Sequence, residues 1–298
     1  MKQPIEKRYW IYAVTPVHVG AGRGLGYIDM PIAREKVTNW PYIPGSSVKG
    51  VIADYFGASE ENRNDNSDEN KKLKAAFGMS GADNESAAGA IVFTDANILC
   101  MPIRSFYGTF AWITSPFCLR RMNINISLNN SDAFVPAPSK LISGVFNVEG
   151  LAKIYLEDID ITVRRSDAAA DIARRIAQSV FTKEDEWQKT FIDRFVIVDD
   201  DIFTFLCEFG TEVNAHIRID ENTGIVRDGA LWYEEALPVE TILTGKIWCD
   251  KSFVEGTSEE NLIKAFCTEE LNIQIGGKAS TGKGQVCFVF EKLERAGE

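Results

Sequence analysis

Alternating apolar positions predict strands near both ends of the chain. Residues 8–14 (RYWIYAV) alternate and carry aromatic side chains, a pattern typical of a strand. Residues 241–250 and 285–294 show the same character near the other end. We therefore expect an α+β fold in which the two terminal portions of the chain are neighbours in one sheet.

Helical periodicity is clearest between these strands, in residues 166–181 (SDAAADIARRIAQSVF). This segment is rich in alanine, begins with an acidic turn, and places Ile172, Ile176 and Val180 on one stripe. Further helices are expected from about residue 49 to 56, at residues 73–78 and at residues 258–271.

Three other segments favour strands. Residues 192–210 (IDRFVIVDDDIFTFLCEFG) predict two strands joined by an acidic turn, and residues 215–235 predict a strand, a turn at 220–224 and a second strand. Residues 106–123 are aromatic but interrupted by glycine and proline, which favours irregular or edge strands over helix.

Composition indicates a globular protein. With 298 residues and 45% hydrophobic content, the chain can bury a sizeable core as one elaborated domain or two small ones. No apolar run is long enough to cross a bilayer, and the charged start leads into a strand, so we expect a cytoplasmic protein without a membrane partner. The six cysteines are widely spaced, without a C-x-x-C pair, which favours buried free thiols over disulfides or a zinc site.

Charge limits the classes of partner. A formal charge of −11 and a pI of about 4.9 argue against a protein that coats nucleic acid with its whole surface, although local basic patches remain possible. Much of the acid lies in residues 59–70 (SEENRNDNSDEN), which predict a solvated, disordered insertion. The arginine doublets at 120–121, 164–165 and 174–175 are typical of surface charge.

Residues 15–50 contain a glycine-rich segment with neither helical nor strand periodicity, which indicates a binding surface rather than a plain loop. Its glycines stand at alternate positions: Gly20, Gly22, Gly24 and Gly26. They permit positive φ and close approach of a ligand to the main chain. Arg23, between them, is a donor for phosphate or carboxylate.

The far end of this segment, PYIPGSSVKG, predicts a turn and then a helix N-terminus. Ser46 and Ser47 are N-cap candidates, and Lys49 lies in the first helical turn. Free N–H groups beside a lysine form a candidate anion site, although an ordinary capped helix explains the pattern equally well.

Two nucleotide-binding motifs nearly match and are rejected. GAGRGLG from residue 20 lacks the G-x-G-x-x-G spacing and is not followed at once by a helix. GKASTGKG from residue 277 has Gly284 where a phosphate-binding loop requires Ser or Thr, and a strand follows it. The second loop, with Lys278 and Lys283 among glycines, still suits a nucleic-acid backbone.

The sequence offers few candidate catalytic side chains. The chain has two histidines, and His18, beside valines, has the pattern of a packed core histidine. Asp29 stands in a segment otherwise poor in acid, where a carboxylate could hold a divalent cation or orient an attacking hydroxyl. The competing interpretation is an aspartate that caps its own turn.

Three motifs together resemble the RAMP superfamily, the repeat-associated proteins of CRISPR effector complexes. They are the segment HVGAGRGLGYIDMPIAREKVTNWPYIPGSSVKG, the late loop GGKASTGKG, and GALWYEEALP near residue 235. Within that family the chain is similar to the repeated backbone subunit of the type III-B (Cmr) RNA-guided complex. The resemblance implies an RRM-like, ferredoxin-type palm within a single domain, residues 1–298, with a helical fingers insertion at about 49–90 and a β-hairpin thumb at about 211–240.

The resemblance also implies an activity and partners. Copies of such a subunit polymerise in a filament along guide RNA with other CRISPR effector subunits, and single-stranded target RNA is cleaved at regular intervals by a metal-dependent endoribonuclease. Cleavage would use a loop aspartate, Asp29, with Mg²⁺ or Mn²⁺ as cofactor, and a neighbouring histidine, His18. Glu234 and Glu235 would contribute from the base of the thumb, beside Tyr233.

On the binding side, the family's guide-gripping lysine corresponds to Lys49, after Ser46 and Ser47. The groove for the guide would be lined by glycines and cations from both ends of the chain: Gly22, Arg23, Gly24, Lys49, Lys278 and Lys283. The outer face then stays acidic, and sequence recognition is left to base pairing.

Two alternatives remain open. One is a purely structural guide-binding subunit that leaves cleavage to another component. The other is a guide-processing endonuclease of the same superfamily, which would use His18 as a general acid or base without metal.

Overall fold

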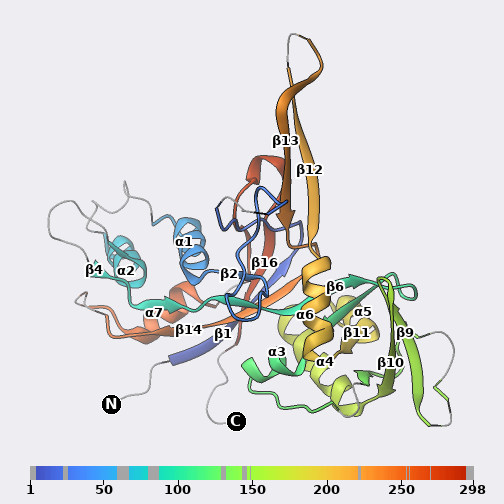
Figure 1. The fold of residues 1–298 in the computed structure, drawn as a ribbon. Coiled ribbons are helices and arrows are strands. Elements are labelled where there is room, and N and C mark those ends of the chain that lie inside the picture. The colour runs from blue at the N-terminus through green and yellow to red at the C-terminus, as the bar shows by residue number, and fades with distance from the viewer. Residues whose placement is uncertain are drawn as a thin grey trace.

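A computed structural model of the protein describes residues 5–22, 26–58, 67–79, 87–128, 132–142, 146–147, 149–220, 223–252, 254, 256–268 and 270–292. The fold is mixed α+β (Figure 1). Its strands are β1 (Ile5–Ala13), β2 (Tyr42–Ile43), β3 (Gly78–Met79), β4 (Ala87–Ala88), β5 (Ile91–Phe93), β6 (Ala96–Arg104), β7 (Phe110–Thr114), β8 (Ala133–Val135), β9 (Leu151–Leu156), β10 (Ile159–Arg165), β11 (Phe195–Ile197), β12 (Glu212–Ile219), β13 (Val226–Ala236), β14 (Ile242–Cys249), β15 (Leu271–Gln274) and β16 (Gln285–Phe290). Its helices are α1 (Gly45–Tyr55), α2 (Asp68–Phe77), α3 (Pro116–Arg121), α4 (Asp167–Val180), α5 (Asp185–Arg194), α6 (Asp200–Phe209) and α7 (Glu259–Phe266), with a short 3-10 turn at Ala279–Thr281.

One large sheet organises the molecule. Its strand order is β15-β16-β1-β14-β6-β7-β11-β8-β10-β9, with β2 and β5 added beside this path. The first strand, β1, lies between β14 and β16 and is antiparallel to both. Its aromatic residues alternate into the core, where the Tyr9 ring stacks on Phe288 at 4.9 Å. This confirms the prediction that the two terminal portions of the chain are neighbours in one sheet.

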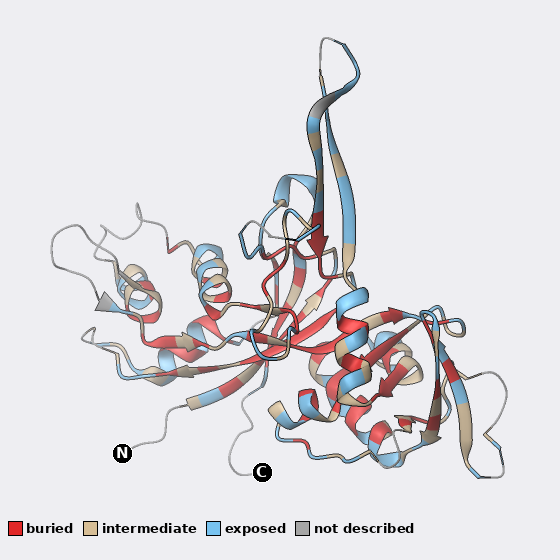
Figure 2. Ribbon diagram, in the orientation of Figure 1, coloured by how far each residue is buried: buried red, intermediate tan, exposed pale blue. Residues whose placement is uncertain are grey.

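Helices pack on the sheet in two groups (Figure 1). On one side of the central strands, α1 contacts β5 and β15, α7 contacts β14, and α2 packs on α1 and α7. On the other side, α4 contacts β1, β8 and β11, and α5 packs on β7. The β12–β13 hairpin projects away from both groups and is exposed along most of its length, while its base is buried (Figure 2).

Local signals account for the elements that the sequence predicted correctly. Helix α4 follows an N-cap serine, Ser166, whose side chain accepts the Ala169 N–H, and it buries the predicted stripe. The hairpin at 215–235 is present as β12 and β13, and Gly78 follows the last residue of α2. Residues 94–95 form a break between β5 and β6.

Two strand predictions are wrong. Residues 200–209 form a helix, α6, because Asp199 caps its N-terminus and two acidic residues occupy its first turn. Phe203, Leu206 and Cys207 are buried at helical spacing. Residues 106–123 contain an interior strand, β7, between β6 and β11, followed by helix α3, which begins with Pro116 after a capping Ser115.

The acidic insertion is also shorter than expected. Residues 68–70 open helix α2, and the Ser67 side chain accepts the Asn70 N–H as its cap, so these residues are not part of a disordered loop. Residues 59–66 lie outside the described residues.

The cysteines are not cross-linked. All six cysteines are free thiols; five are buried and Cys287 is half-buried, as predicted. Within the described ranges, no helix has the length and apolar character of a membrane span.

Candidate functional site

The second half of the glycine-rich segment lies along the base of the hairpin. Met30 pairs with β13: its N–H donates to the Tyr233 carbonyl at 3.1 Å, and the Glu235 N–H donates to the Met30 carbonyl at 3.0 Å. Val17 forms a further bridge with Leu237. The segment therefore continues the hairpin's hydrogen bonding as an added extended strand, which explains how a stretch without periodicity is held in place.

Asp29 is fixed by the same contact. Its Oδ2 accepts the Tyr233 N–H at 2.8 Å, and its own N–H donates to the Tyr233 carbonyl at 3.1 Å. The residue is exposed, and its Oδ1 makes no hydrogen bond within the parts of the chain that the structure describes. One carboxylate oxygen is thus used to orient the side chain, while the other is available to a ligand.

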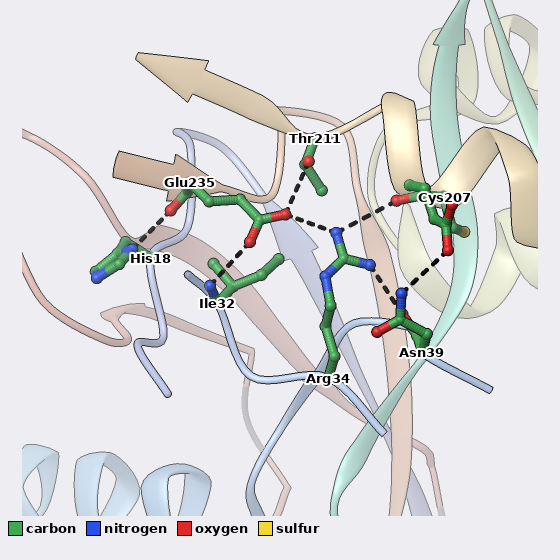
Figure 3. Close-up of polar contacts among 8 residues, drawn as sticks. His18, Ile32, Arg34, Asn39, Cys207, Thr211 and Glu235 are labelled. Atoms are coloured by element: carbon green, nitrogen blue, oxygen red, sulfur yellow. Dashed lines mark hydrogen bonds and ion pairs between the residues drawn. The ribbon is translucent and has the colours of Figure 1, made fainter. Parts of the chain in front are cut away.

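Glu235 connects the base of the hairpin to the second half of the glycine-rich segment (Figure 3). Its carboxylate is 2% exposed and accepts a hydrogen bond from the Arg34 guanidinium at 2.6 Å. The same carboxylate accepts from Thr211 Oγ1 at 2.9 Å and from the Ile32 N–H at 3.0 Å. A buried carboxylate tolerates burial only with such partners. Glu235 therefore acts as a positioning residue for the strand that carries Asp29.

His18 joins both ends of the chain at this point. The imidazole is buried, and because a carbonyl can only accept, Nδ1 carries the proton and donates to the Glu235 carbonyl at 2.6 Å (Figure 3). The His18 carbonyl in turn accepts the Gly277 N–H at 2.9 Å. Gly276 has φ +88° there, and a Cβ on it would lie 2.3 Å from the His18 carbonyl oxygen, so the late loop requires glycine to dock.

Glu234 faces the late glycine loop. It is 1% exposed, and its oxygens bind Lys283 Nζ at 2.7 Å and Lys278 Nζ at 3.1 Å. Burial acts to raise its pKa, but the hydrogen bonds from the two lysines outweigh burial and the pKa is lowered. His216 Nε2 lies 4.0 Å from the same carboxylate. Lys278 and Lys283 are therefore ion-paired, a contact that the sequence analysis did not foresee.

The other predicted binding residues belong to a separate element. Ser46, Ser47 and Lys49 lie in α1, and no hydrogen bond or ion pair among the described residues connects them to the hairpin base. Lys49 is half-buried, and burial lowers its pKa. Gly22, with φ +93°, has open space around its Cα, whereas Arg23 and Gly24 lie outside the described residues.

Neither serine caps α1, so that prediction is wrong. The helix begins at Gly45 after Pro44, and the Asp95 carboxylate accepts the Gly45 N–H at 2.7 Å in place of a serine. A Cβ on Gly45 would lie 2.5 Å from the Phe93 carbonyl oxygen, so glycine allows the helix to begin against the β5–β6 turn. One of the free N–H groups proposed for an anion is therefore already bonded.

Sequence reasoning missed Arg34 and Glu35, the R-E pair of the first motif. Arg34 reaches Glu235, as described, and Glu35 accepts two hydrogen bonds from Arg121, at 2.7 and 2.8 Å. Burial acts to raise the pKa of Glu35, but the Arg121 and Thr38 hydrogen bonds lower it overall. Consecutive opposite charges in a stretch bounded by Pro31 and Pro41 were the available signal, but sequence alone did not identify partners so distant along the chain.

The described residues contain no preformed cluster for a metal. Among the described residues, no group of three or more His, Cys, Asp or Glu side chains is placed to hold an ion. Mg²⁺ is commonly bound by one or two carboxylates together with waters and substrate phosphates. Asp29, exposed and with one unbonded oxygen, fits the role of a single protein ligand of that kind.

Comparisons with known proteins agree over most of the chain. The model of the RAMP superfamily matches residues 10–287. CRISPR system Cmr endoribonuclease Cmr4 from Pyrococcus furiosus is 32% identical over 298 residues, covering 96% of this chain and 96% of that protein.

Solved structures show the same fold. The crystal structure of oligomeric Cmr4 from Pyrococcus furiosus has a TM-score of 0.66 at 25% identity and covers 97% of this chain and 99% of that one. A chain in the cryo-EM structure of the type III-B Cmr-beta complex bound to cognate target RNA has a TM-score of 0.71 at 18% identity, covering 96% and 97%. On the strength of the family match and the full-length relative, this chain belongs to the RAMP superfamily.

Proposed function

We propose that this protein is the repeated backbone subunit of a type III-B CRISPR effector complex, in which it binds guide RNA and cleaves complementary target RNA. The full-length relative at 32% identity is named an endoribonuclease of the Cmr system. The observation that carries the proposal is the exposed Asp29 carboxylate, oriented by the Tyr233 N–H at the base of a projecting hairpin. Guide and target RNA, other copies of this chain and other Cmr subunits are its partners in the cytoplasm.

The topology supports a ferredoxin-type palm. The strands β16, β1, β14 and β6 are adjacent and antiparallel, α1 lies between β1 and β6 in the sequence, and α7 lies between β14 and β16. This is a βαββαβ arrangement. We assign the helical region at about 49–90 to the fingers and the β12–β13 hairpin, within 211–240, to the thumb.

The two faces of the hairpin differ, which supports its assignment as a thumb. Ile217 pairs with Leu231, and Ala215 with Tyr233; alternate residues of a strand share a face, so these side chains form one exposed and largely apolar face. The opposite face carries the stacked His216 and Trp232 rings. Apolar and aromatic side chains on a projecting ribbon can wedge or stack against bases that leave a duplex.

Asp29 would act at a phosphate of the target strand where bases leave the guide–target duplex. The chain holds the carboxylate at a fixed angle through Tyr233 and leaves Oδ1 for the ligand. A bound Mg²⁺ or Mn²⁺ would stabilise charge that develops on the phosphate oxygens. Attack by the neighbouring 2′-hydroxyl on phosphorus, with loss of its proton and departure of the 5′ oxygen, would leave a cyclic phosphate and a 5′-hydroxyl and restrict the activity to RNA.

The guide-binding surface would combine several cations with an acidic exterior. Lys49 has no carboxylate partner among the described residues and is the strongest phosphate contact on α1. Lys278 and Lys283 share one buried carboxylate, so the trio with Glu234 retains a single net positive charge. Arg23 and Gly24, outside the described residues, and Gly22, Ser46 and Ser47 complete the surface that we propose.

Two substitutions test the cleavage assignment in the assembled complex. Asp29→Asn keeps an oxygen that can accept the Tyr233 N–H but removes the charge, and Asp29→Ala removes both. Each should lower the rate of target cleavage by about 100-fold or more while guide and target binding persist. Asp158→Asn, an exposed carboxylate in the β9–β10 turn, serves as the control and should cleave normally.

The outcomes separate the alternatives. A regular cleavage ladder that EDTA abolishes and Mg²⁺ restores supports a metal-dependent enzyme, and wild-type cleavage by Asp29→Ala contradicts the assignment. Binding without any cleavage would indicate a purely structural subunit. Cutting of precursor repeat RNA in EDTA would indicate a guide-processing enzyme that uses His18, which the burial of His18 and its bond to Glu235 argue against.

A further inference from the structure

A cavity lies at the end of β1 that is distant from the hairpin. Its volume is about 240 Å³, and β1, the C-terminal half of α4 and the segment after α3 form its walls. At the opposite end of β1, the Ala13 carbonyl accepts the Glu240 N–H, close to the hairpin base. Arg8 precedes Ala13 by five positions, which corresponds to roughly 17 Å along a strand. The cavity is therefore separate from the Asp29 site.

The pleat of β1 determines which side chains face this cavity. Alternate residues of a strand share a face, so Arg8 and Trp10 lie on one side and Tyr9 on the other, where its ring stacks on Phe288. Tyr12, on the same side as Arg8, contacts Phe181 directly after α4. This face of β1 is thus the one that α4 covers.

Two of the guanidinium groups that line the cavity, those of Arg8 and Arg175, form no ion pair among the described residues. The lining contains four basic and two acidic residues. Glu6 pairs with Lys246, and Glu291 accepts the backbone N–H of Arg8 rather than its side chain. Within the described ranges, neither Arg8 nor Arg175 has a carboxylate within 4.0 Å of its guanidinium nitrogens. In a chain of net charge −11, a cavity with excess positive charge is a local exception.

The cavity wall also contains a buried hydrogen-bond donor, the Trp10 indole N–H. Trp10 is 2% exposed, and its indole N–H has no hydrogen-bond partner among the described residues. Buried donors without a partner are rare, because the lost hydrogen bond costs free energy. Burial also lowers the pKa of Arg8, while the charges of Glu291 and Glu6 act to raise it. An anion in the cavity would accept hydrogen bonds from such donors.

We propose that this cavity binds a small phosphorylated anion, with its phosphate held by Arg8 and Arg175. Guanidinium groups bind phosphate oxygens in a planar, two-pronged geometry. A volume of about 240 Å³ is below that of common cofactor pockets, which start near about 300 Å³. The ligand is therefore inorganic phosphate or a phosphomonoester no larger than a nucleoside monophosphate.

Calorimetric titration of the full-length protein, without guide RNA, tests this site with inorganic phosphate and with adenosine monophosphate. We expect saturable binding of at least one of the two. Arg175→Gln should weaken it by about tenfold or more, because a charge-assisted hydrogen bond is lost. Arg8→Gln should do the same. Tighter binding of the monophosphate than of phosphate would show that the sugar or base is also contacted, and equal binding would identify a phosphate site.

The matched control is Arg174→Gln, next to Arg175 on the same helix. Arg174 is paired with Asp171 at 2.8 Å and does not line the cavity, so this variant should bind within about twofold of wild type. Because Arg175 is exposed, its substitution should leave the thermal unfolding temperature unchanged, which guards against loss of binding through misfolding.

Three results would overturn the proposal. The first is absence of binding for both ligands to wild type. The second is an equal loss of affinity in Arg174→Gln and Arg175→Gln, which would indicate nonspecific attraction. The third is competition by an RNA oligomer without a terminal phosphate that is as effective as competition by the monophosphate. This result would indicate recognition of an RNA backbone.

Discussion

The base of the β12–β13 hairpin and its projecting half are stabilised in different ways. At the base, Glu234 and Glu235 are buried, and side chains from both ends of the chain hold them. Farther out, among the described residues, β12 pairs only with β13, and the ribbon is largely exposed (Figure 2). Ile217 and Leu231 are among its exposed side chains. A two-stranded ribbon is marginally stable alone. The base of the hairpin, which pairs with the segment that contains Asp29, is therefore fixed. The outer half of the hairpin is free to adapt to a partner.

The largest effect should come from the Glu235 carboxylate. Glu235→Ala leaves the Arg34 guanidinium, 16% exposed, without its partner and should lower the free energy of unfolding by about 3 kcal/mol. Urea denaturation measures the change. The double variant Arg34→Met with Glu235→Leu is the control and should recover part of the loss, because it leaves no unpaired buried charge. A change below about 0.5 kcal/mol in Glu235→Ala would contradict a fixed base.

Glu234→Gln should have the next largest effect, with a defined pH dependence. The pKa of Glu234 is lowered below its usual 4.5, so its ion pairs stabilise the fold fully above that pH and are lost as the pH falls through the lowered value. The variant should be less stable than wild type by about 2 kcal/mol at pH 7, and the difference should shrink below about pH 4.5.

The pH series needs only unfolding measurements on the two proteins. A difference that is constant from pH 7 to pH 3 would show that Lys278 and Lys283 do not depend on Glu234's charge. Because loss of Glu234 also frees the two lysines, the same variant should bind guide RNA with a steeper dependence on salt.

The smallest effect on stability is expected in the outer half of the hairpin. Leu231→Ser should change the free energy of unfolding by no more than about 0.5 kcal/mol, because the side chain is already exposed. The same variant should alter target cleavage in the assembled complex. Val37→Ser, at an exposed apolar position outside the hairpin, is the control for both measurements. A large loss of stability in Leu231→Ser would remove the distinction between base and outer half.

The sequence predicted elements whose signals are local. Alternation and a turn identified the hairpin, and an acidic first turn with an apolar stripe identified α4. The failure at α6 has a local cause too, since the aspartates before Ile202 are helix-capping residues that resemble a turn. Asp29 was singled out by its position in an acid-poor segment and then by motif resemblance, not by periodicity.

Ion pairs between distant segments were beyond sequence reasoning. Lys283 and Glu234 are 49 positions apart, and Arg34 and Glu235 are 201 positions apart. Lysines among glycines predict free cations, and only the fold shows that a buried carboxylate lies between them. For the same reason the Asp95 carboxylate at the start of α1 replaced the serines that the local pattern favoured.

The position of β1 between β14 and β16 has a consequence for biosynthesis. Both neighbours follow β1 by more than 200 residues, so a nascent polypeptide exposes both edges of β1 until β14 has been synthesised, and one edge until residues through Phe290 have been synthesised. Pairings over such long sequence separations form slowly. The central sheet must therefore assemble after Phe290 has been translated, and chaperones that shield strand edges should associate with the growing chain before that point.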